Sequence, residues 1–366
     1  MATPPPYSSH EIVFEHMKRE FLYVEGTIKN ALVVLLHPFN GTPETALARF
    51  ADLYHKGFSI LVPRGIEKSW NGGACCGRAV LLGLNDVGFV RELTRFVMKQ
   101  KFIHPLKAYI VGVSNGAFLA SKVALTSIAH GEDWIKGVAL ISGYTYDLDV
   151  YEAARSNAIA ANSNIVFPIL ALHGKDDQSV KIEGCCHEDC CCGITSNQCF
   201  SFQSAFEEWS KITMCASTGV ENTQHNHLLA SRNVTCTKGK ACMAHVEFCQ
   251  VANAGHRLDD IIPVADIVTS FFYQNLQKSQ NLVELTTRKE VISSRGVNPR
   301  APPVTATPPW QGVVIVVLFV VSLLFTLNRV FKTRSRSASN YGEVANAREL
   351  QSLTGRTGTN FAAAQV

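Results

Sequence analysis

The fold of this chain is decided by the stretch Ala108-Tyr109-Ile110-Val111-Gly112-Val113-Ser114-Asn115-Gly116. Its first six residues predict a buried strand, and the apolar residues 117–124 predict a helix. The pattern G-x-S-x-G between them places a serine on a tight strand-to-helix turn, where side chains at 112 or 116 would collide with neighbouring elements. The alternative is a plain turn without chemistry. In this context we expect an exposed, nucleophilic hydroxyl at the carboxyl edge of a sheet.

Strands alternate with helices from about residue 11 to residue 278. Continuous apolar runs predict strands that are buried on both faces. The alternation therefore predicts an α/β fold, with helices on both faces of a mostly parallel sheet. The expected strands are Ala31–His37, Phe58–Pro63, Ala108–Val113, Gly137–Ser142, Ile165–Leu172 and His245–Val251, and the expected helices are Asn85–Lys99, Ala117–Ala124 and Leu258–Leu276.

A serine hydroxyl is a poor nucleophile unless a base and an orienting acid assist it. In folds with this turn, the three residues follow in the order Ser, Asp or Glu, His. Asp177 follows one predicted strand and His256 follows the last one, so both lie where sites of parallel sheets assemble. Asp176 remains an alternative acid. The other eleven histidines, His37 and His173 among them, fit the order or the loops less well.

Two backbone N–H groups are candidates for stabilising an oxyanion. The N–H of Asn115 stands at the start of a helix, where donors are free. The second donor is expected from the loop 37–42 after an early strand. Because Pro38 has no N–H, the predicted donor is Phe39.

With these residues in place, the chain resembles the α/β-hydrolase family of polyhydroxybutyrate depolymerases and feruloyl or acetylxylan esterases. The resemblance covers about residues 20–275. Its matching segments are 32–37 with Gly41-Thr42, Ser69-Trp70-Asn71-Gly72-Gly73-Ala74-Cys75-Cys76-Gly77, Asn85-Asp86-Val87-Gly88-Phe89, the turn at Ser114, His173-Gly174 with Asp177, and Gly255-His256. It implies Ser114 as nucleophile, Asp177 as acid, His256 as base, Phe39 and Asn115 as oxyanion hole, and Trp70 in substrate binding. It implies no cofactor, and a structural role for Asp86 at a helix start.

The sequence departs from that family at two places. Pro38 stands where the family has glycine, which stiffens the loop and can alter access of substrate. The insertion Glu183–Phe200 is absent from the family. It begins a few residues after Asp177, so we expect it near the mouth of the site.

The 12 cysteines all lie between Cys75 and Cys249, and six of them lie in the insertion. Cys186, His187, Cys190 and Cys199 could be drawn as a zinc site, but no paired C-x₂-C motif frames them. An even number confined to one part of the chain favours disulfides and no bound metal. Free thiols remain an alternative. A bridge from Cys215 to Cys236 or Cys242 is expected near the last strand.

The C-terminal part predicts a membrane anchor. Residues 310–328 are uncharged and apolar, and as a helix these 19 residues would span about 28 Å, close to the roughly 30 Å of a hydrocarbon core. The alternative is a buried helix, but both flanks are of low complexity. The predicted divisions are an N-terminal extension 1–19, an α/β-hydrolase domain 20–278, a Pro/Thr-rich stalk 279–309, the transmembrane helix 310–328, and a basic, disordered tail 329–366.

The tail predicts the orientation of the anchor. It holds six of the 34 basic and two of the 30 acidic residues, and the positive-inside rule places it in the cytoplasm. The cysteines and the sequon at Asn233 would then lie in an extracellular or lumenal domain. The Pro-rich N-terminus shows no apolar core of a secretory signal, which leaves open an internal start, unusual targeting or reduced cysteines.

The remaining residues carry 28 basic and 28 acidic groups, which is not the charge of a nucleic-acid-binding protein. The leading hypothesis is therefore a membrane-anchored serine esterase. The resemblance implies feruloyl or acetyl esters of polysaccharides, or short-chain polyhydroxyalkanoates, as substrates. A non-catalytic surface receptor that reuses a hydrolase domain is the alternative from another class. A peptidase of the same fold fits the segment around Trp70 less well.

Overall fold

A ten-stranded sheet forms the frame of the computed structural model. The structure describes residues 4–73, 75–101, 103, 107–161, 165–184, 200–222 and 234–278. They all lie in one compact unit, Met1–Arg288, and the other unit, Lys289–Val366, contains none of them. The strands are β1 (Ser8–Phe14), β2 (Met17–Val24), β3 (Leu32–Leu36), β4 (Ser59–Pro63), β5 (Ala108–Val113), β6 (Ile135–Ile141), β7 (Ile169–Gly174), β8 (Ser217–Asn222), β9 (Val234–Lys240) and β10 (Val246–Val251).

The strand order is β1-β2-β4-β3-β5-β6-β7-β10-β9-β8. The central strands β4, β3, β5, β6, β7 and β10 are parallel, and the strands outside them pair antiparallel. Together with the serine turn that follows β5, this order is that of the α/β-hydrolase fold. The predicted fold class is thereby confirmed for the described residues.

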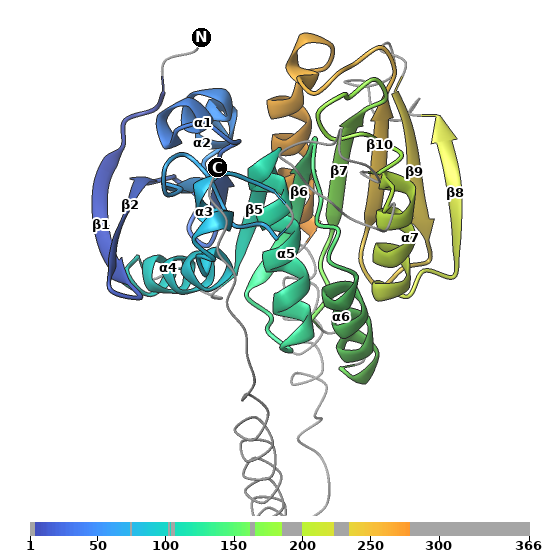
Figure 1. Ribbon diagram of the computed structural model, residues 1–366, viewed down its shortest axis with the longest axis horizontal. Helices are drawn as coiled ribbons and strands as arrows, with labels where there is room; N and C mark the ends of the chain where they lie inside the picture. The colour runs from blue at the N-terminus through green and yellow to red at the C-terminus, as the bar shows by residue number, and fades with distance from the viewer. Residues whose placement is uncertain are drawn as a thin grey trace, which may run out of the picture. The chain divides into compact units, whose positions relative to one another are not determined.

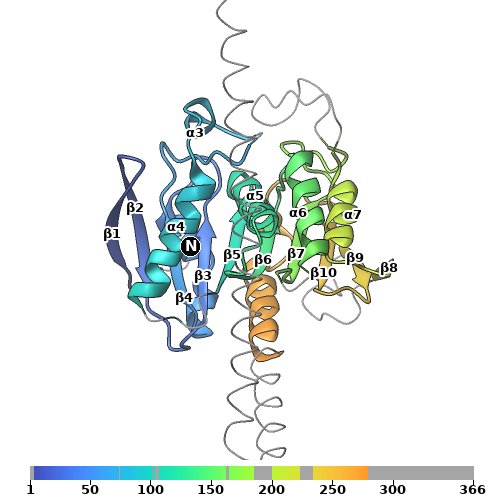
Figure 2. The ribbon, with the colours of Figure 1, turned by 90° about the horizontal axis from the view of Figure 1, so that it is seen from below.

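Helices cover both faces of the sheet, as Figures 1 and 2 show. Side chains alternate along each central strand, so that Val34 of β3 faces one apolar cluster and Val33 faces the other. The first cluster packs against α4, α5, α6 and α7, and the second against α1, α2 and a helix over residues 264–278. These helices are α1 (Pro43–Arg49), α2 (Ala51–His55), α4 (Asp86–Gln100), α5 (Asn115–Ala129), α6 (Leu148–Ala160) and α7 (Phe202–Ile212), and a short α3 (Arg78–Leu81) precedes α4.

The N-terminal boundary of the domain differs from the prediction. Residues 8–14 form β1 and β2 begins at Met17, so this part of the predicted extension 1–19 belongs to the sheet. Ile12 and Phe14 pack on the first apolar cluster, and Arg19 is buried against α4. The short alternation of these strands is a weaker signal than the apolar runs of the central ones.

The last predicted helix is interrupted. Leu258–Asp260 forms a short 3₁₀ helix, η2, and the long helix begins only after Pro263. Proline is favoured at the start of a helix and disfavoured inside it, because it lacks the N–H that an interior position requires.

Several predictions lie outside the described residues. These are the stalk 279–309, the membrane span 310–328, the tail 329–366, the sequon Asn233 and residues 185–199 of the insertion. Among the helices that the structure does describe, none is long and apolar enough to cross a membrane.

Candidate active site

The turn after β5 holds Ser114 in a backbone conformation that few residues adopt. Its φ is 53° and its ψ is −119°, directly before the first residue of α5. A Cβ on Gly112 would lie 2.2 Å from the carbonyl oxygen of Gly116, and a Cβ on Gly116 would lie 2.2 Å from that of Leu36. Both glycines are therefore required by close packing, as the sequence predicted.

The structure brings His256 and Asp177 to Ser114. His256 Nε2 lies 2.8 Å from Ser114 Oγ, and His256 Nδ1 lies 2.8 Å from Asp177 Oδ2. Ser114 follows β5, Asp177 follows β7 and His256 follows β10, whose carboxyl ends meet at one edge of the sheet (Figure 1). Asp176 is exposed and does not contact His256, so the alternative acid is not the one placed in the array.

Hydrogen bonds hold the Asp177 carboxylate in its ionised form. Burial raises the pKa of this carboxyl, but hydrogen bonds from His173, His256 and the Val180 N–H lower it by more, so its pKa lies well below the ordinary value. Oδ1 accepts from the N–H groups of Ser179 and Val180 at 2.8 and 2.9 Å. An ionised carboxylate can only accept, so His256 donates through Nδ1 and leaves Nε2 free to accept the serine proton.

His173 is a neighbour of this array that the sequence did not indicate. It is fully buried, its Nε2 lies 2.7 Å from the Val180 carbonyl oxygen, and the same atom lies 3.4 Å from Asp177 Oδ2. Because a carbonyl oxygen accepts, Nε2 of His173 carries a proton. The H-G-x-x-D spacing from His173 to Asp177 was the signal that could have indicated this contact.

The two predicted oxyanion donors flank Ser114. The N–H of Asn115 stands at the N-terminus of the 15-residue helix α5, and Phe39 lies in the loop after β3, beside Ser114 in one cavity. Within the described part of the chain, neither N–H has a hydrogen-bond acceptor. The pair can therefore serve an anionic oxygen.

The loop of Phe39 is positioned by a neutral histidine. His37 is fully buried, and its Nε2 accepts from the N–H of Gly65 at 3.0 Å. Its Nδ1 then donates to the carbonyl oxygen of Pro38 at 2.9 Å. Burial, with a smaller contribution from the charge of Arg64, lowers the pKa of His37 and keeps the ring uncharged.

Trp70, expected to bind substrate, lies elsewhere. Its side chain is fully buried, does not line the cavity beside Ser114, and donates from Nε1 to the carbonyl oxygen of His37 at 3.0 Å. Its backbone N–H donates to Asn115 Oδ1 at 2.8 Å, and Asn115 Nδ2 donates to the carbonyl oxygens of Trp70 and Cys75 at 2.9 and 2.7 Å. These hydrogen bonds link Trp70 both to the loop that begins at His37 and to the serine turn.

A cavity of about 570 Å³ opens beside Ser114 and His256. Its wall is formed largely by apolar residues, among them Leu35 of β3, Val111 of β5 and Phe50, which lies between α1 and α2. Cys76, which forms a disulfide with the adjacent Cys75, also lines it. The volume and lining suit a small organic ligand whose reacting carbon can reach the serine.

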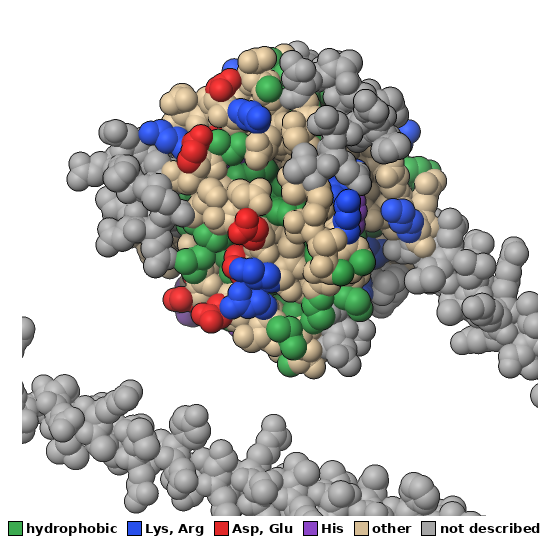
Figure 3. Space-filling view, turned by 90° about the vertical axis from the view of Figure 1, so that its right-hand side faces the viewer, with side chains coloured by type: hydrophobic (Ala, Val, Ile, Leu, Met, Phe, Trp, Pro, Cys, Tyr) green, Lys and Arg blue, Asp and Glu red, His purple; other side chains and the backbone are tan. Residues whose placement is uncertain are grey.

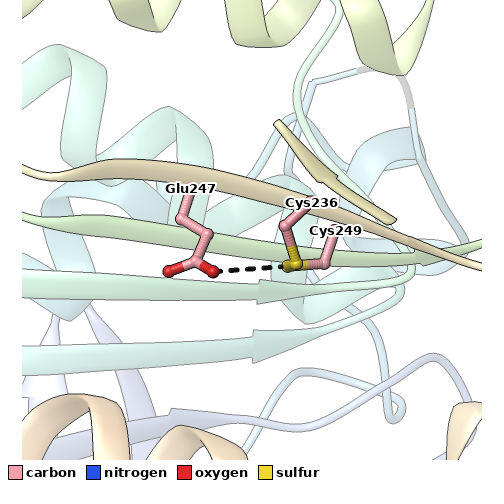
Figure 4. Close-up of side chains that lie close together, drawn as sticks. All are labelled: Cys236, Glu247 and Cys249. Carbon is pink, nitrogen blue, oxygen red and sulfur yellow. Dashed lines mark hydrogen bonds between the residues drawn. A yellow bond between two sulfur atoms is a disulfide. The ribbon is translucent and has the colours of Figure 1, made fainter. Parts of the chain in front are cut away.

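The other described disulfides lie in and beside the antiparallel strands β8 and β9 and the neighbouring β10. Cys215 pairs with Cys242, one of the two predicted pairings, and Cys236 pairs with Cys249. Cys236, Glu247 and Cys249 lie close together, as Figure 4 shows, but the disulfide removes both thiolates that a metal would need. The zinc candidates of the insertion fall outside the described residues.

Asp86 has a structural role, although it is not the cap of its helix. The side chain of Asn85 caps α4 by accepting from the N–H of Gly88 at 2.9 Å. The Asp86 carboxylate is buried, where it pairs with Arg19 at 2.7 Å and accepts from the N–H of Asn71 at 2.8 Å.

No protein-family model matches this sequence, and a comparison with curated proteins gives no match. Among solved structures, an acetyl xylan esterase from Aspergillus awamori is 14% identical, with a TM-score of 0.48 over 72% of this chain and 98% of its own. TT1662 from Thermus thermophilus is 18% identical, with a TM-score of 0.43 over 74% of this chain and 99% of its own. The strand order and the serine turn, rather than these similarities, establish the fold.

Proposed function

We propose that this protein is a serine hydrolase that cleaves carboxylic esters through an acyl-enzyme. The observation that carries the proposal is the continuous hydrogen-bonded array from Asp177 through His256 to Ser114. The two free N–H groups beside the serine supply the other part that acyl transfer needs.

The proposed reaction begins when Ser114 Oγ attacks the ester carbonyl carbon and His256 Nε2 takes the hydroxyl proton. The carbonyl oxygen becomes an oxyanion that accepts hydrogen bonds from the N–H groups of Phe39 and Asn115. The intermediate then expels the alcohol, which takes the proton back from His256. Water, activated by the same histidine, releases the acid. Asp177 remains ionised and holds the imidazole in the required tautomer.

The substrate class is proposed from the resemblance of the sequence to esterases. Feruloyl or acetyl esters of polysaccharides and short-chain polyhydroxyalkanoates are the substrates that the motifs around Trp70 and Ser114 imply. The cavity of about 570 Å³ is compatible with an acyl group or with a single monomer unit.

We also propose that residues 310–328 anchor the enzyme in a lipid bilayer, with the hydrolase domain outside or in a lumen. The uncharged run and the basic residues after it support this orientation. The disulfides Cys215–Cys242 and Cys236–Cys249 are compatible with an oxidising compartment.

The test is Ser114→Ala in the full chain, purified in detergent and assayed on feruloyl, acetyl and hydroxybutyrate esters. Loss of the nucleophile should reduce kcat by about 10⁴-fold or more and abolish labelling by a fluorophosphonate. Ser121→Ala is the matched control, because Ser121 is buried in α5, the helix that follows Ser114, and does not line the cavity. Retention of more than a tenth of the activity by Ser114→Ala would exclude the assignment. A folded wild-type protein that is inert to every ester would instead favour the receptor.

A further inference from the structure

The cavity beside Ser114 is charged on the side that faces α1 and η2. Its lining includes three charged residues, Arg49, Arg257 and Asp259. The rest of the wall is largely apolar, so these three groups are unusual members of it. Two positive charges against one negative charge leave the lining with an excess of one positive charge.

Arg49 and Asp259 neutralise one another. Arg49 Nη2 lies 2.5 Å from Asp259 Oδ2, and Arg49 Nε lies 3.3 Å from Asp259 Oδ1. This is the two-point geometry that a guanidinium and a carboxylate prefer. The pair links the end of α1 to η2, and the Asp259 carboxylate already has its counter-charge in Arg49.

Arg257 supplies the unbalanced charge. It follows His256 directly, it is exposed, and within the described residues it has no ion pair and no side-chain hydrogen bond. Burial lowers the pKa of Arg49, the Asp259 carboxylate opposes that shift, and the positive charge of Arg257 adds a smaller lowering. An anion besides Asp259, placed between Arg49 and Arg257, would relieve the repulsion between these two residues.

We propose that Arg257 is a specificity residue that binds an anionic group, a carboxylate in particular, on the ester that this site cleaves. This inference rests on the proposed function, because it takes Ser114 as the point of attack. An arginine fits a carboxylate through two parallel N–H donors, and it stays charged at every working pH. The apolar wall accommodates the hydrocarbon between the carboxylate and the ester.

The proposal is tested by binding, so that it does not depend on turnover. The full chain with Ser114→Ala in detergent is titrated in a calorimeter with two pairs of ligands of matched shape. Monoethyl glutarate against ethyl 5-methylhexanoate places the carboxylate on the acid side of the ester. 3-Acetoxypropanoate against 3-methylbutyl acetate places it on the alcohol side. At least one anionic ligand should bind roughly tenfold more tightly than its neutral match, which corresponds to one charge-assisted hydrogen-bonded contact.

The variants show whether Arg257 causes that preference. Adding Arg257→Gln should remove it, Arg257→Lys should restore part of it, and added salt should weaken it only while the charge is present. Lys99→Gln is the matched control, because it removes one positive charge from the exposed side of α4, outside the cavity. The proposal would be overturned if the anionic and neutral ligands bound equally, or if neither bound at millimolar concentration. It would also be overturned if Lys99→Gln reduced the preference for the anionic ligand as much as Arg257→Gln does.

Hydrolysis by the wild-type chain separates this inference from the proposed function. If the wild type cleaves neutral esters and Arg257→Gln does not change the preference for anionic ligands, the esterase function stands and the anion subsite is excluded. If the Ser114→Ala chain prefers anionic ligands but the wild type hydrolyses no ester, the esterase function is excluded and the cavity is an anion-binding site only.

Discussion

At the scale of single residues, the geometry of Ser114 depends on neighbours that take no part in proton transfer. Asn115 is one of them, because its side chain ties the serine turn to the backbone of Trp70 and Cys75 with three hydrogen bonds. Each of these polar groups is buried, so each lost partner would leave an unsatisfied group. The side chain of Asn115 therefore fixes the loop, while its backbone N–H is the proposed oxyanion donor.

Asp177→Asn should lower kcat by about 10⁴-fold while the protein stays folded. An amide can present its N–H₂ group to His256 and so favour the tautomer that cannot accept the serine proton. The measurement is steady-state hydrolysis of a small acetyl ester, with circular dichroism to confirm the fold. Asp176→Asn changes the adjacent, exposed carboxylate and should retain activity within a few-fold. A reversed pattern would move the acid to Asp176 and contradict the described array.

The triad residues were predictable, because their order along the chain and their places after strands are properties of the sequence. Other contacts were not. The approach of His173 to Asp177, the tie made by Asn115 and the burial of Trp70 depend on how loops fold over one another. Trp70 illustrates the limit, since a motif can mark a residue as important without showing whether it touches substrate or supports the loops that do.

At the scale of elements, a buried ion pair joins β2 to α4. The Arg19 and Asp86 side chains are 1% and 0% exposed, and Arg19 also lies 3.8 Å above the ring of Phe89. Burying two charges is favourable only while each keeps its partner. The pair therefore fixes the antiparallel β1–β2 hairpin against the parallel part of the sheet.

Arg19→Met should destabilise the protein by about 3–5 kcal/mol, because it leaves the Asp86 carboxylate buried without a counter-charge. The check is a shift of the midpoint of denaturant unfolding. Adding Asp86→Asn to Arg19→Met should recover part of the loss, since no isolated charge then remains. Lys18→Met is the neighbouring control: Lys18 and Glu11 form an exposed pair, and its loss should change stability by less than about 1 kcal/mol. Equal effects at positions 18 and 19 would contradict a structural role for the pair.

The central elements were predicted more completely than the edges. The expected strand Ala108–Val113 has the predicted bounds, and the other parallel strands agree within a few residues, because strands buried on both faces read as apolar runs. The antiparallel strands β1, β2, β8 and β9 were not predicted. β1 is mostly exposed and β9 is rich in Thr and Lys, so neither carries a clear apolar pattern.

At the scale of the whole molecule, the net charge of the tail differs from that of the rest of the chain. Basic and acidic side chains lie near one another on the face shown in Figure 3, without one extended basic surface there. The excess positive charge of the sequence lies instead after residue 328, directly beyond the predicted membrane span. Under the positive-inside rule, this asymmetry supports the proposed orientation, with the C-terminus in the cytosol.

The last prediction concerns that orientation, and it belongs to the full chain. If residues 310–328 span a bilayer with the tail in the cytosol, protease added to sealed microsomes should remove only the tail and leave a hydrolase domain of protected size. Asn233 of the sequon Asn233-Val234-Thr235 should then carry a glycan. Asn233→Gln would remove this glycan, which is measured as faster migration of the protein on a gel. Asn40→Gln is the control. Asn40 begins a second formal sequon, Asn40-Gly41-Thr42, but it lies in the loop of Phe39, where no glycan is expected, and its N–H donates to the carbonyl oxygen of Lys68. Digestion of the hydrolase domain in intact vesicles, without a glycan at Asn233, would place the domain in the cytosol. In that compartment Cys215–Cys242 and Cys236–Cys249 would be expected as thiols, so alkylation before reduction gives an independent measure of the same topology.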